Sequence, residues 1–275
     1  MIQVRMPIIH PYEIAISRTV HAEHLILKVY TGDGFVFSEC AAGAIPGFSY
    51  ETMGTAREVL KSLILPVVMG KTIPGPDGLD PLCKKVRGHP MAKAVVENAL
   101  WILRAQQMGI SLAEMLGNRR DRLPAGAGVG IQDTKEDLVG LISQYVSQAY
   151  PKIKMKIKPG KDIKFVEHVR MAFPDISLMV DGNNAYSLDD ANIFKVLDAF
   201  GLLMIEQPLA YDDILDHSRL QAQLKTPIGL DESIVEPSSA RQAIEIKACR
   251  CINIKQARVG GLGKAKEIHD ICQKG

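Results

Sequence analysis

Residues 152–158 read KIKMKIK, and Pro159 and Gly160 follow at once. Successive side chains of a β-strand point to opposite faces, so the lysines of this stretch share one face and the apolar residues share the other. The lysines are Lys152, Lys154, Lys156 and Lys158, and the apolar residues are Ile153, Met155 and Ile157. Taken alone, the pattern is typical of an edge or antiparallel strand whose lysines lie in water. The segments that follow favour another interpretation.

The chain becomes regular after Leu123 and Pro124. A short apolar run, a loop and an amphipathic helix of about 10–15 residues follow one another repeatedly. The apolar runs are 127–131, 153–157, 177–180, 202–205, 228–230 and 251–254. They start about 22–26 residues apart, which is the repeat expected of β-α units in a parallel sheet. Residues 124–275 are therefore predicted to form an α/β fold of the (β/α) barrel type.

The first 123 residues have a different pattern. Strand-like segments at 2–9, 24–31 and 34–39 include one pair joined by Thr31-Gly32-Asp33-Gly34, a good hairpin signal. Helical periodicity follows at roughly 50–64 and 90–109. This pattern predicts a separate α+β domain at residues 1–123.

Composition limits the class of protein. The 275 residues carry 33 basic and 31 acidic side chains, a formal charge of +2, so no global field attracts nucleic acid or an anionic membrane. No apolar run is long enough to span a membrane, and no signal peptide is evident. The five scattered cysteines indicate a reducing compartment, and Cys249 and Cys251 are interpreted as buried strand residues rather than half of a metal site. These features predict a soluble cytoplasmic protein that binds neither nucleic acid nor membrane.

Three apolar runs end in an acidic residue. These residues are Asp181, Glu206 and Asp231, and each interval is 25 residues. One β-α unit moves the chain to the next barrel strand, so the three acids are expected to meet at one rim. Clustered carboxylates repel one another unless a cation lies among them, and Mg²⁺ accepts such oxygen ligands. Each acid alone is explained equally well as a helix cap, but three in register favour a metal site.

The next apolar run ends in Lys255. The second and sixth strands lie opposite each other in an eight-stranded barrel, so Lys154 and Lys156 would face Lys255 across a bound ligand. Lys156 is the lysine expected to reach the reaction, and Lys154 beside it would favour its neutral, basic form by like-charge repulsion.

The segments KMK, VDGNNAY, MIEQPLAYDDILDH, LDESI and INIKQARVGG resemble the enolase superfamily, in its muconate-lactonizing-enzyme subgroup. The likeness covers nearly the whole chain and is greatest to the o-succinylbenzoate synthase and N-succinylamino acid racemase family. It implies an enolase-type barrel with an N-terminal α+β capping domain. It also implies that Asp181, Glu206 and Asp231 bind Mg²⁺, or Mn²⁺ or another divalent ion, and that Lys156 and Lys255 are the acid/base pair. The handling of an enediolate by a lysine and Mg²⁺ is established chemistry of this superfamily.

Further positions follow from the resemblance. Asn183 would orient the site, although a turn asparagine explains it equally well, and Glu232 adjoins a proposed ligand. Gly128 stands where the family usually has a serine that helps to hold the substrate, so that contact is lost or replaced. Residues 12–19, YEIAISRT, lack the usual loop sequence that closes over the substrate.

The resemblance also predicts two barrel strands and a carboxyl-terminal segment beyond Gly275, so the barrel is expected to be incomplete. The sheet is then a fragment, is completed by another chain, or is rearranged. The predicted assembly is a homo-oligomer.

Three functions are consistent with these residues. The first is an o-succinylbenzoate synthase, a Mg²⁺-dependent lyase that dehydrates a small carboxylate in menaquinone biosynthesis, with or without N-succinylamino acid racemisation. The second is another enzyme of the subgroup, a cycloisomerase or dipeptide epimerase. The third is a truncated, catalytically inactive metal-binding protein.

Overall fold

The N-terminal part is built on a three-stranded antiparallel sheet. The structure, a computed structural model, describes residues 1–15, 17–32, 34–117 and 120–274. The strands are β1 (Ile2–Ile14), β2 (Ser17–Thr31) and β3 (Gly34–Cys40), in the order β1-β2-β3. The predicted hairpin joins β2 to β3 through the pair Thr31 and Gly34, and its Asp33 lies outside the described residues.

Strand β1 extends beyond the predicted end at Ile9. Its register against β2 shifts between Pro7 and Tyr12, and pairing resumes from Tyr12 to Ile14. Pro7 and Pro11 cannot donate backbone hydrogen bonds, which interrupts the ladder without ending this edge strand. The sequence 12–19 is therefore mostly strand, with Ile16 outside the described residues.

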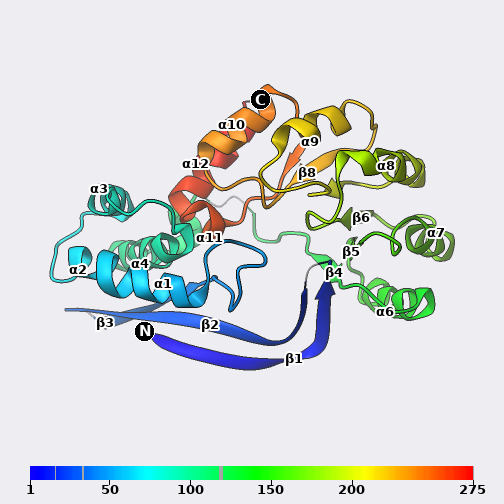
Figure 1. Cartoon of the computed structure of the whole chain (residues 1–275). Helices are drawn as coiled ribbons and strands as arrows, with labels where there is room; N and C mark the ends of the chain where they lie inside the picture. Colours follow the sequence, from blue (N-terminus) through cyan, green and yellow to red (C-terminus); the bar gives the residue numbers. More distant parts are fainter. Residues whose placement is uncertain (16, 33, 118–119, 275) are drawn as a thin grey trace.

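Helices cover one face of this sheet (Figure 1). They are α1 (Met53–Val59), a π-helical turn (Leu60–Ile64), α2 (Leu65–Val68), a 3₁₀ turn (Pro76–Gly78), α3 (Leu79–Cys83), α4 (Pro90–Met108) and α5 (Leu112–Met115). Leu25, Leu27 and Cys40 are buried in one apolar cluster with residues of α4 such as Val95. The predicted helices at 50–64 and 90–109 are confirmed.

The second part is a six-stranded parallel sheet in the sequential order β4 to β9. Its strands are β4 (Gly126–Val129), β5 (Lys152–Lys156), β6 (Leu178–Asp181), β7 (Ile205–Glu206), β8 (Ile228–Leu230) and β9 (Cys251–Ile252). The helices are α6 (Lys135–Ser147), α7 (Ile163–Ala172), α8 (Ala191–Leu197), α9 (Ile214–Gln221), α10 (Pro237–Glu245), α11 (Gln256–Val259) and α12 (Leu262–Cys272), with 3₁₀ turns at Leu188–Asp190 and Asp198–Phe200. The repeated β-α order confirms the α/β barrel topology read from the spacing of the apolar runs. Within the described residues, β4 and β9 each have one unpaired edge.

The alternating stretch in β5 has the predicted register. Ile153, Met155 and Ile157 are buried in the core between the sheet and its helices, while Lys154 and Lys156 point to the other face, toward acids of β6 and β7. Lys152 is exposed. The alternation therefore marks a strand with one apolar and one functional face, rather than lysines in water.

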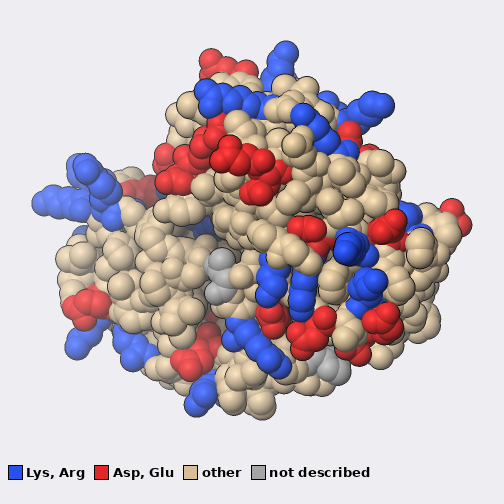
Figure 2. Space-filling model, turned by 45° about the vertical axis from the view of Figure 1, so that its right-hand side comes forward, with Lys and Arg blue, Asp and Glu red and all other residues tan. Residues whose placement is uncertain are grey.

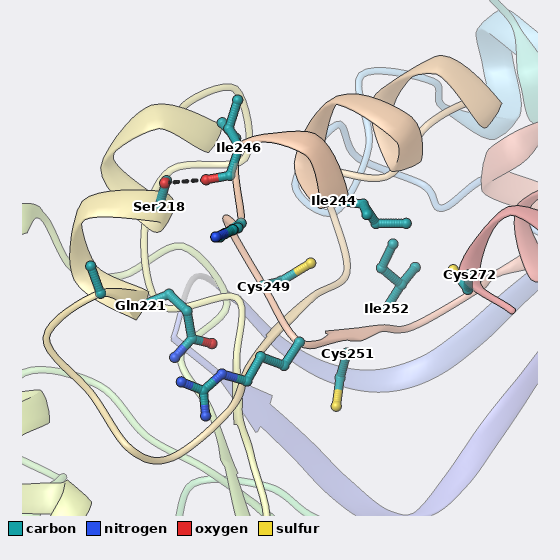
Figure 3. Close-up of a pocket in the computed structure, with 11 residues that line it drawn as sticks. Ser218, Gln221, Ile244, Ile246, Cys249, Cys251, Ile252 and Cys272 are labelled. Atoms are coloured by element: carbon teal, nitrogen blue, oxygen red, sulfur yellow. Dashed lines mark hydrogen bonds between the residues drawn. The ribbon is translucent and has the colours of Figure 1, made fainter. Parts of the chain in front are cut away.

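A cavity of about 660 Å³ lies among α9, α10, β9 and α12, and three cysteines line it (Figure 3). All five cysteines are free thiols. Cys251 is exposed, so the interpretation of both strand cysteines as buried is wrong for this one, because β9 lies at an edge of the sheet. Cys249 is only partly buried, and burial raises the pKa of its thiol to about 12.

No helix in the described part of the chain is both long and apolar enough to cross a bilayer. On the face shown in Figure 2, acidic and basic side chains are interspersed.

Candidate active site

Three acidic residues lie side by side at the carboxyl ends of neighbouring strands. The ladder pairs Asp181 of β6 with Glu206 of β7, and Glu206 with Gly229 of β8. Asp231 follows directly on β8. All three residues are almost completely buried, with at most 1% of their surface exposed. Unpaired carboxylates are costly to bury, so the partners of these three define the chemistry of the site.

Two lysines of β5 approach one end of this row. The Lys156 ammonium donates to Asp181 Oδ2 at 2.6 Å and to Asn183 Oδ1 at 2.7 Å. The Lys154 ammonium lies 3.0 Å from Asp181 Oδ2 and donates to both oxygens of Glu206 at 3.1 Å. The predicted lysine pair of β5 therefore contacts the predicted acids directly.

Lys255 and Arg258 approach the other end of the row. The Lys255 ammonium donates to Asp231 Oδ2, and Arg258 Nη1 donates to Asp231 Oδ1 at 2.5 Å. Asn253 Nδ2 donates to Glu206 Oε1 at 2.9 Å. Lysines thus contact the row at both ends, as the barrel order predicted.

Sequence reasoning missed Asn253 and Arg258. The sequence contained a signal for each of them. Asn253 lies two residues before Lys255, so the two share a face at strand spacing. Arg258 follows Lys255 at a spacing of three, which returns to the same side of a helix, and α11 begins directly after Lys255. Arg258 is only 3% exposed and also donates to the carbonyls of Ile234 and Asn253.

Asn183 joins Asp181 to Glu232. Its backbone N–H donates to Asp181 Oδ1 at 3.0 Å, and its side-chain amide donates to Glu232 Oε1 at 2.9 Å. Its φ of 42° is also that of a turn asparagine, so its conformation agrees with the structural interpretation while its contacts link two acids of the site. The other oxygen of Glu232, Oε2, is buried with no hydrogen-bond partner among the described residues.

Burial and neighbouring charges shift the pKa values of several residues of the site. Burial alone would lower the pKa of Lys154, but the charges of Asp181 and Glu206 outweigh it and raise that pKa above its ordinary value. Burial, together with the charge of Asp181, raises the pKa of Glu206. Burial and then the charge of Asp231 raise the pKa of Glu232 to about 7. Burial is thus the main cause that favours the neutral form of Glu206 and Glu232, and the neighbouring carboxylates add to it.

The residues at this rim fit a divalent cation. Within the described residues, no three His, Cys, Asp or Glu side chains are arranged to hold a metal ion as they stand. Lysine and arginine nitrogens contact the acids instead. The donor set nevertheless consists of buried carboxylates on adjacent strands, with one orphaned carboxylate oxygen beside them. Hard cations prefer such oxygen ligands, and a lysine side chain can rotate away from them.

Two cavities open onto this rim. One, of about 490 Å³, is lined by Gly128 of β4 together with Lys154, Glu206 and Asn253. Gly128 pairs with Lys154 in the β4–β5 ladder, which places the predicted substrate position beside the charged row.

The second cavity, of about 260 Å³, separates residues 46–50 of the N-terminal part from Glu232 and Arg258. The Phe48 ring covers the Lys255 ammonium there, 4.4 Å from ring centroid to nitrogen. The N-terminal part therefore forms one wall of the site.

The fold and the site together define a (β/α) barrel with an N-terminal capping sheet and lysines at both ends of a carboxylate row. The family described as Enolase C-terminal domain-like matches residues 137–275, and the Mandelate racemase / muconate lactonizing enzyme, N-terminal domain matches residues 1–117. The chain belongs to the enolase superfamily, as the sequence motifs indicated.

Individual relatives are similar over nearly all of the chain. An o-succinylbenzoate synthase of Geobacillus kaustophilus is 43% identical over 98% of this chain and 72% of its own length. An N-succinylamino acid racemase of Thermus thermophilus is 39% identical over 98% of this chain and 73% of its own length. A crystal structure of an enolase-superfamily member from Listeria innocua, 38% identical, superposes with a TM-score of 0.93 over 98% of this chain and 73% of that one.

Proposed function

We propose that the chain is a divalent-metal-dependent lyase of the o-succinylbenzoate synthase type, which dehydrates a small carboxylate through an enediolate in menaquinone biosynthesis. The observation that carries the proposal is the placement of Lys156 and Lys255 at opposite ends of one row of buried carboxylates. The 43% identity to a relative of that name supports the choice of reaction.

The chemistry requires this arrangement. A proton beside a carboxylate is weakly acidic, because its removal adds a second negative charge to the group. A divalent cation held by Asp181, Glu206 and Asp231 would supply positive charge where that charge develops. Lys156 is placed to take or return the proton on one side, and Lys255 is placed to do so on the other.

Racemisation of N-succinylamino acids is the second candidate. Elimination needs one base and an acid for the leaving group, whereas racemisation needs a proton-transfer group on each face of the same carbon. Lysines at both ends of the row meet that need, and a relative named for this activity is 39% identical.

The test is a matched assay of both reactions with the purified chain. We expect turnover of the succinylbenzoate precursor with added Mg²⁺ and its loss with EDTA, restored by excess Mg²⁺. Turnover that is unchanged by EDTA would contradict the metal assignment. Absence of both reactions in the presence of Mg²⁺ would favour the inactive metal-binding alternative.

We also propose two domains, 1–123 and 124–275, because the two parts have different apolar clusters, with Ala257 of α11 the one buried residue of the second part, among those described, in the cluster of the first. Thermolysin cleavage between α5 and β4 should release fragments near this boundary. The proposed location is the cytoplasm, which the five free thiols support.

A homo-oligomer is proposed through the outer face of the N-terminal sheet. Exposed apolar side chains are concentrated on this face: Ile2, Met6, Tyr30, Phe35 and Phe37. The Lys28 ammonium lies among the aromatic rings, 3.9 Å from the Phe35 centroid, and Glu39 is exposed on the same face. This face carries an acid and a base, and Glu39 already pairs with His24 of its own chain. A twofold-related copy therefore offers Lys28 a carboxylate as well as an apolar surface, so a second copy of this chain is the proposed partner.

Light scattering after gel filtration tests this surface. Phe37→Ser should give monomers, and Leu215→Ser on α9, an exposed apolar residue far along the chain, should leave the assembly intact. A monomeric wild type, or an assembly that Phe37→Ser does not change, would overturn the proposed interface.

A further inference from the structure

The end of β1, still paired with β2, reaches β4 of the barrel (Figure 1). The backbone N–H of Ile131 donates to the carbonyl of Glu13 at 2.8 Å, and the Lys158 ammonium donates to the Glu13 carboxylate at 3.1 Å. These contacts fix the end of β1 at the mouth of the barrel. Tyr12, the neighbour of Glu13, is therefore held beside the active site.

Glycines on β4 and just after it make room for Tyr12. A Cβ added at Gly128 would lie 3.4 Å from the Tyr12 hydroxyl oxygen, and one added at Gly130 would lie 3.3 Å from its ring and 3.0 Å from the backbone of Glu13. Gly128 and Gly130 share one face at strand spacing. The phenol therefore lies along a surface from which side chains are missing.

The hydroxyl of Tyr12 lies within the field of the carboxylate row. Burial raises the pKa of Tyr12, the charge of Lys154 lowers it, and the charges of Asp181 and Glu206 raise it further. The group therefore stays a neutral donor near neutral pH. No residue in the described ranges hydrogen-bonds to this hydroxyl, whereas Lys154 and Glu206, whose charges act on it, are bonded to each other. The phenol O–H remains free to bind a ligand.

We propose that Tyr12 is a substrate-binding residue, whose hydroxyl donates a hydrogen bond to a carboxylate oxygen of the substrate on the β4 side of the site. Gly128 provides no polar group of its own at this position, and the phenol from the N-terminal part supplies one. The proposal rests on the proposed function, since it assumes a carboxylate substrate beside Lys154.

The test moves the hydroxyl group from Tyr12 to position 128. Tyr12→Phe removes only the oxygen, Gly128→Ser places a hydroxyl on β4, and the double variant moves the hydroxyl from one residue to the other. Hydrogen bonds to charged groups predict a loss in kcat/KM of about 10- to 100-fold for Tyr12→Phe. The double variant should recover most of that loss. Tyr150→Phe, at an exposed tyrosine between α6 and β5, is the matched control and should behave as wild type.

Calorimetry with o-succinylbenzoate and Mg²⁺ gives a readout independent of turnover. Tyr12→Phe should weaken binding of this compound, and the double variant should restore it. Equal affinity and equal kcat/KM in Tyr12→Phe and wild type would overturn the assignment while leaving the proposed function intact. A loss that Gly128→Ser rescues neither in kcat/KM nor in affinity would show that a hydroxyl at this place does not bind the carboxylate, and would also overturn it. A wild type that neither binds nor turns over a carboxylate substrate would remove the proposed function and this role with it.

Discussion

Two sets of buried carboxylates in this chain differ in their partners. At the rim, side-chain nitrogens of Lys154, Lys156, Lys255 and Arg258 compensate Asp181, Glu206 and Asp231. Elsewhere, Glu51 accepts from the backbone N–H groups of Met91 and Ala92 at 2.7 and 2.9 Å. Glu97 likewise accepts from the backbone of Leu262 and Gly263 at 2.8 and 2.9 Å.

The kind of partner distinguishes the acids of the candidate site from the acids that stabilise the fold. Backbone N–H groups at the start of α4 and α12 cannot move away without unwinding the helix, so Glu51 and Glu97 act as caps between distant segments. Lysine ammonium groups can rotate and leave their carboxylates to a metal ion or a substrate. Burial of an acid alone therefore does not identify a site, whereas the kind of partner does.

The largest expected effect is at the rim lysines. Lys156→Ala and Lys255→Ala should each lower the rate of racemisation by about 10²- to 10⁴-fold, the range for loss of one acid/base group. Circular dichroism should show an intact fold. Lys152→Ala is the control, because this exposed lysine belongs to the same strand but lies outside the carboxylate row. Comparable losses in all three variants would contradict the assignment of Lys156 and Lys255 as the acid/base groups.

The second effect concerns metal affinity. Asp181→Asn, Glu206→Gln and Asp231→Asn should each weaken Mg²⁺ binding and turnover together, because each removes a charged ligand. Glu97→Gln removes an equally charged, buried group and should leave Mg²⁺ affinity unchanged in calorimetry. If Glu97→Gln weakened Mg²⁺ binding as much as the rim variants, the distinction between the two sets would fail.

Third, Glu51→Ala should destabilise the fold by about 1–3 kcal/mol, since it leaves two N–H donors at the start of α4 unsatisfied. The free energy of unfolding in urea measures this, with Mg²⁺ affinity as the unaffected readout. Unchanged stability would show that water replaces the cap at little cost.

The smallest effect is a pH dependence of stability at Glu97. Burial raises the pKa of this carboxyl above its ordinary value of 4.5, and the charge of Asp80 adds to the shift. A raised pKa in the folded state means that the stabilising contribution is complete below the unfolded pKa and is lost as pH rises through the folded pKa. The free energy of unfolding of wild type minus that of Glu97→Gln should therefore decrease as pH rises from about 4.5.

An exposed carboxyl provides a control of opposite sign. Backbone and side-chain hydrogen bonds from Ser111 lower the pKa of Glu114, so its contribution should be lost as pH falls rather than as it rises. Equal slopes for Glu97→Gln and Glu114→Gln would contradict the assignment.

Local periodicity was enough to predict much of the barrel and its rim. The alternation in β5 gave the register of Lys154 and Lys156, and the 25-residue spacing brought Asp181, Glu206 and Asp231 together. These features depend on strand and β-α repeats, which leave regular traces in the sequence.

Contacts between distant segments leave no regular pattern in the sequence. Glu51 caps a helix 40 residues away, and Tyr12 reaches Gly128 only because β1 continues past Pro11 into the barrel. Neither residue type nor spacing indicates these partners, since tertiary packing alone sets them. Arg258, the charged partner of Asp231, lies on α11 one helical turn after Lys255, where the strand periodicity that marked Lys255 has already ended.

The most direct test of the central claim is proton exchange at the substrate carbon, followed by ¹H NMR in D₂O with Mg²⁺. Each enantiomer of an N-succinylamino acid would be incubated with wild type, Lys156→Ala and Lys255→Ala. Wild type should exchange the α-proton of both enantiomers, and each variant should retain exchange of one enantiomer only, with opposite preference. Exchange of both enantiomers by either variant, or of neither by wild type, would contradict the assignment of one lysine to each face.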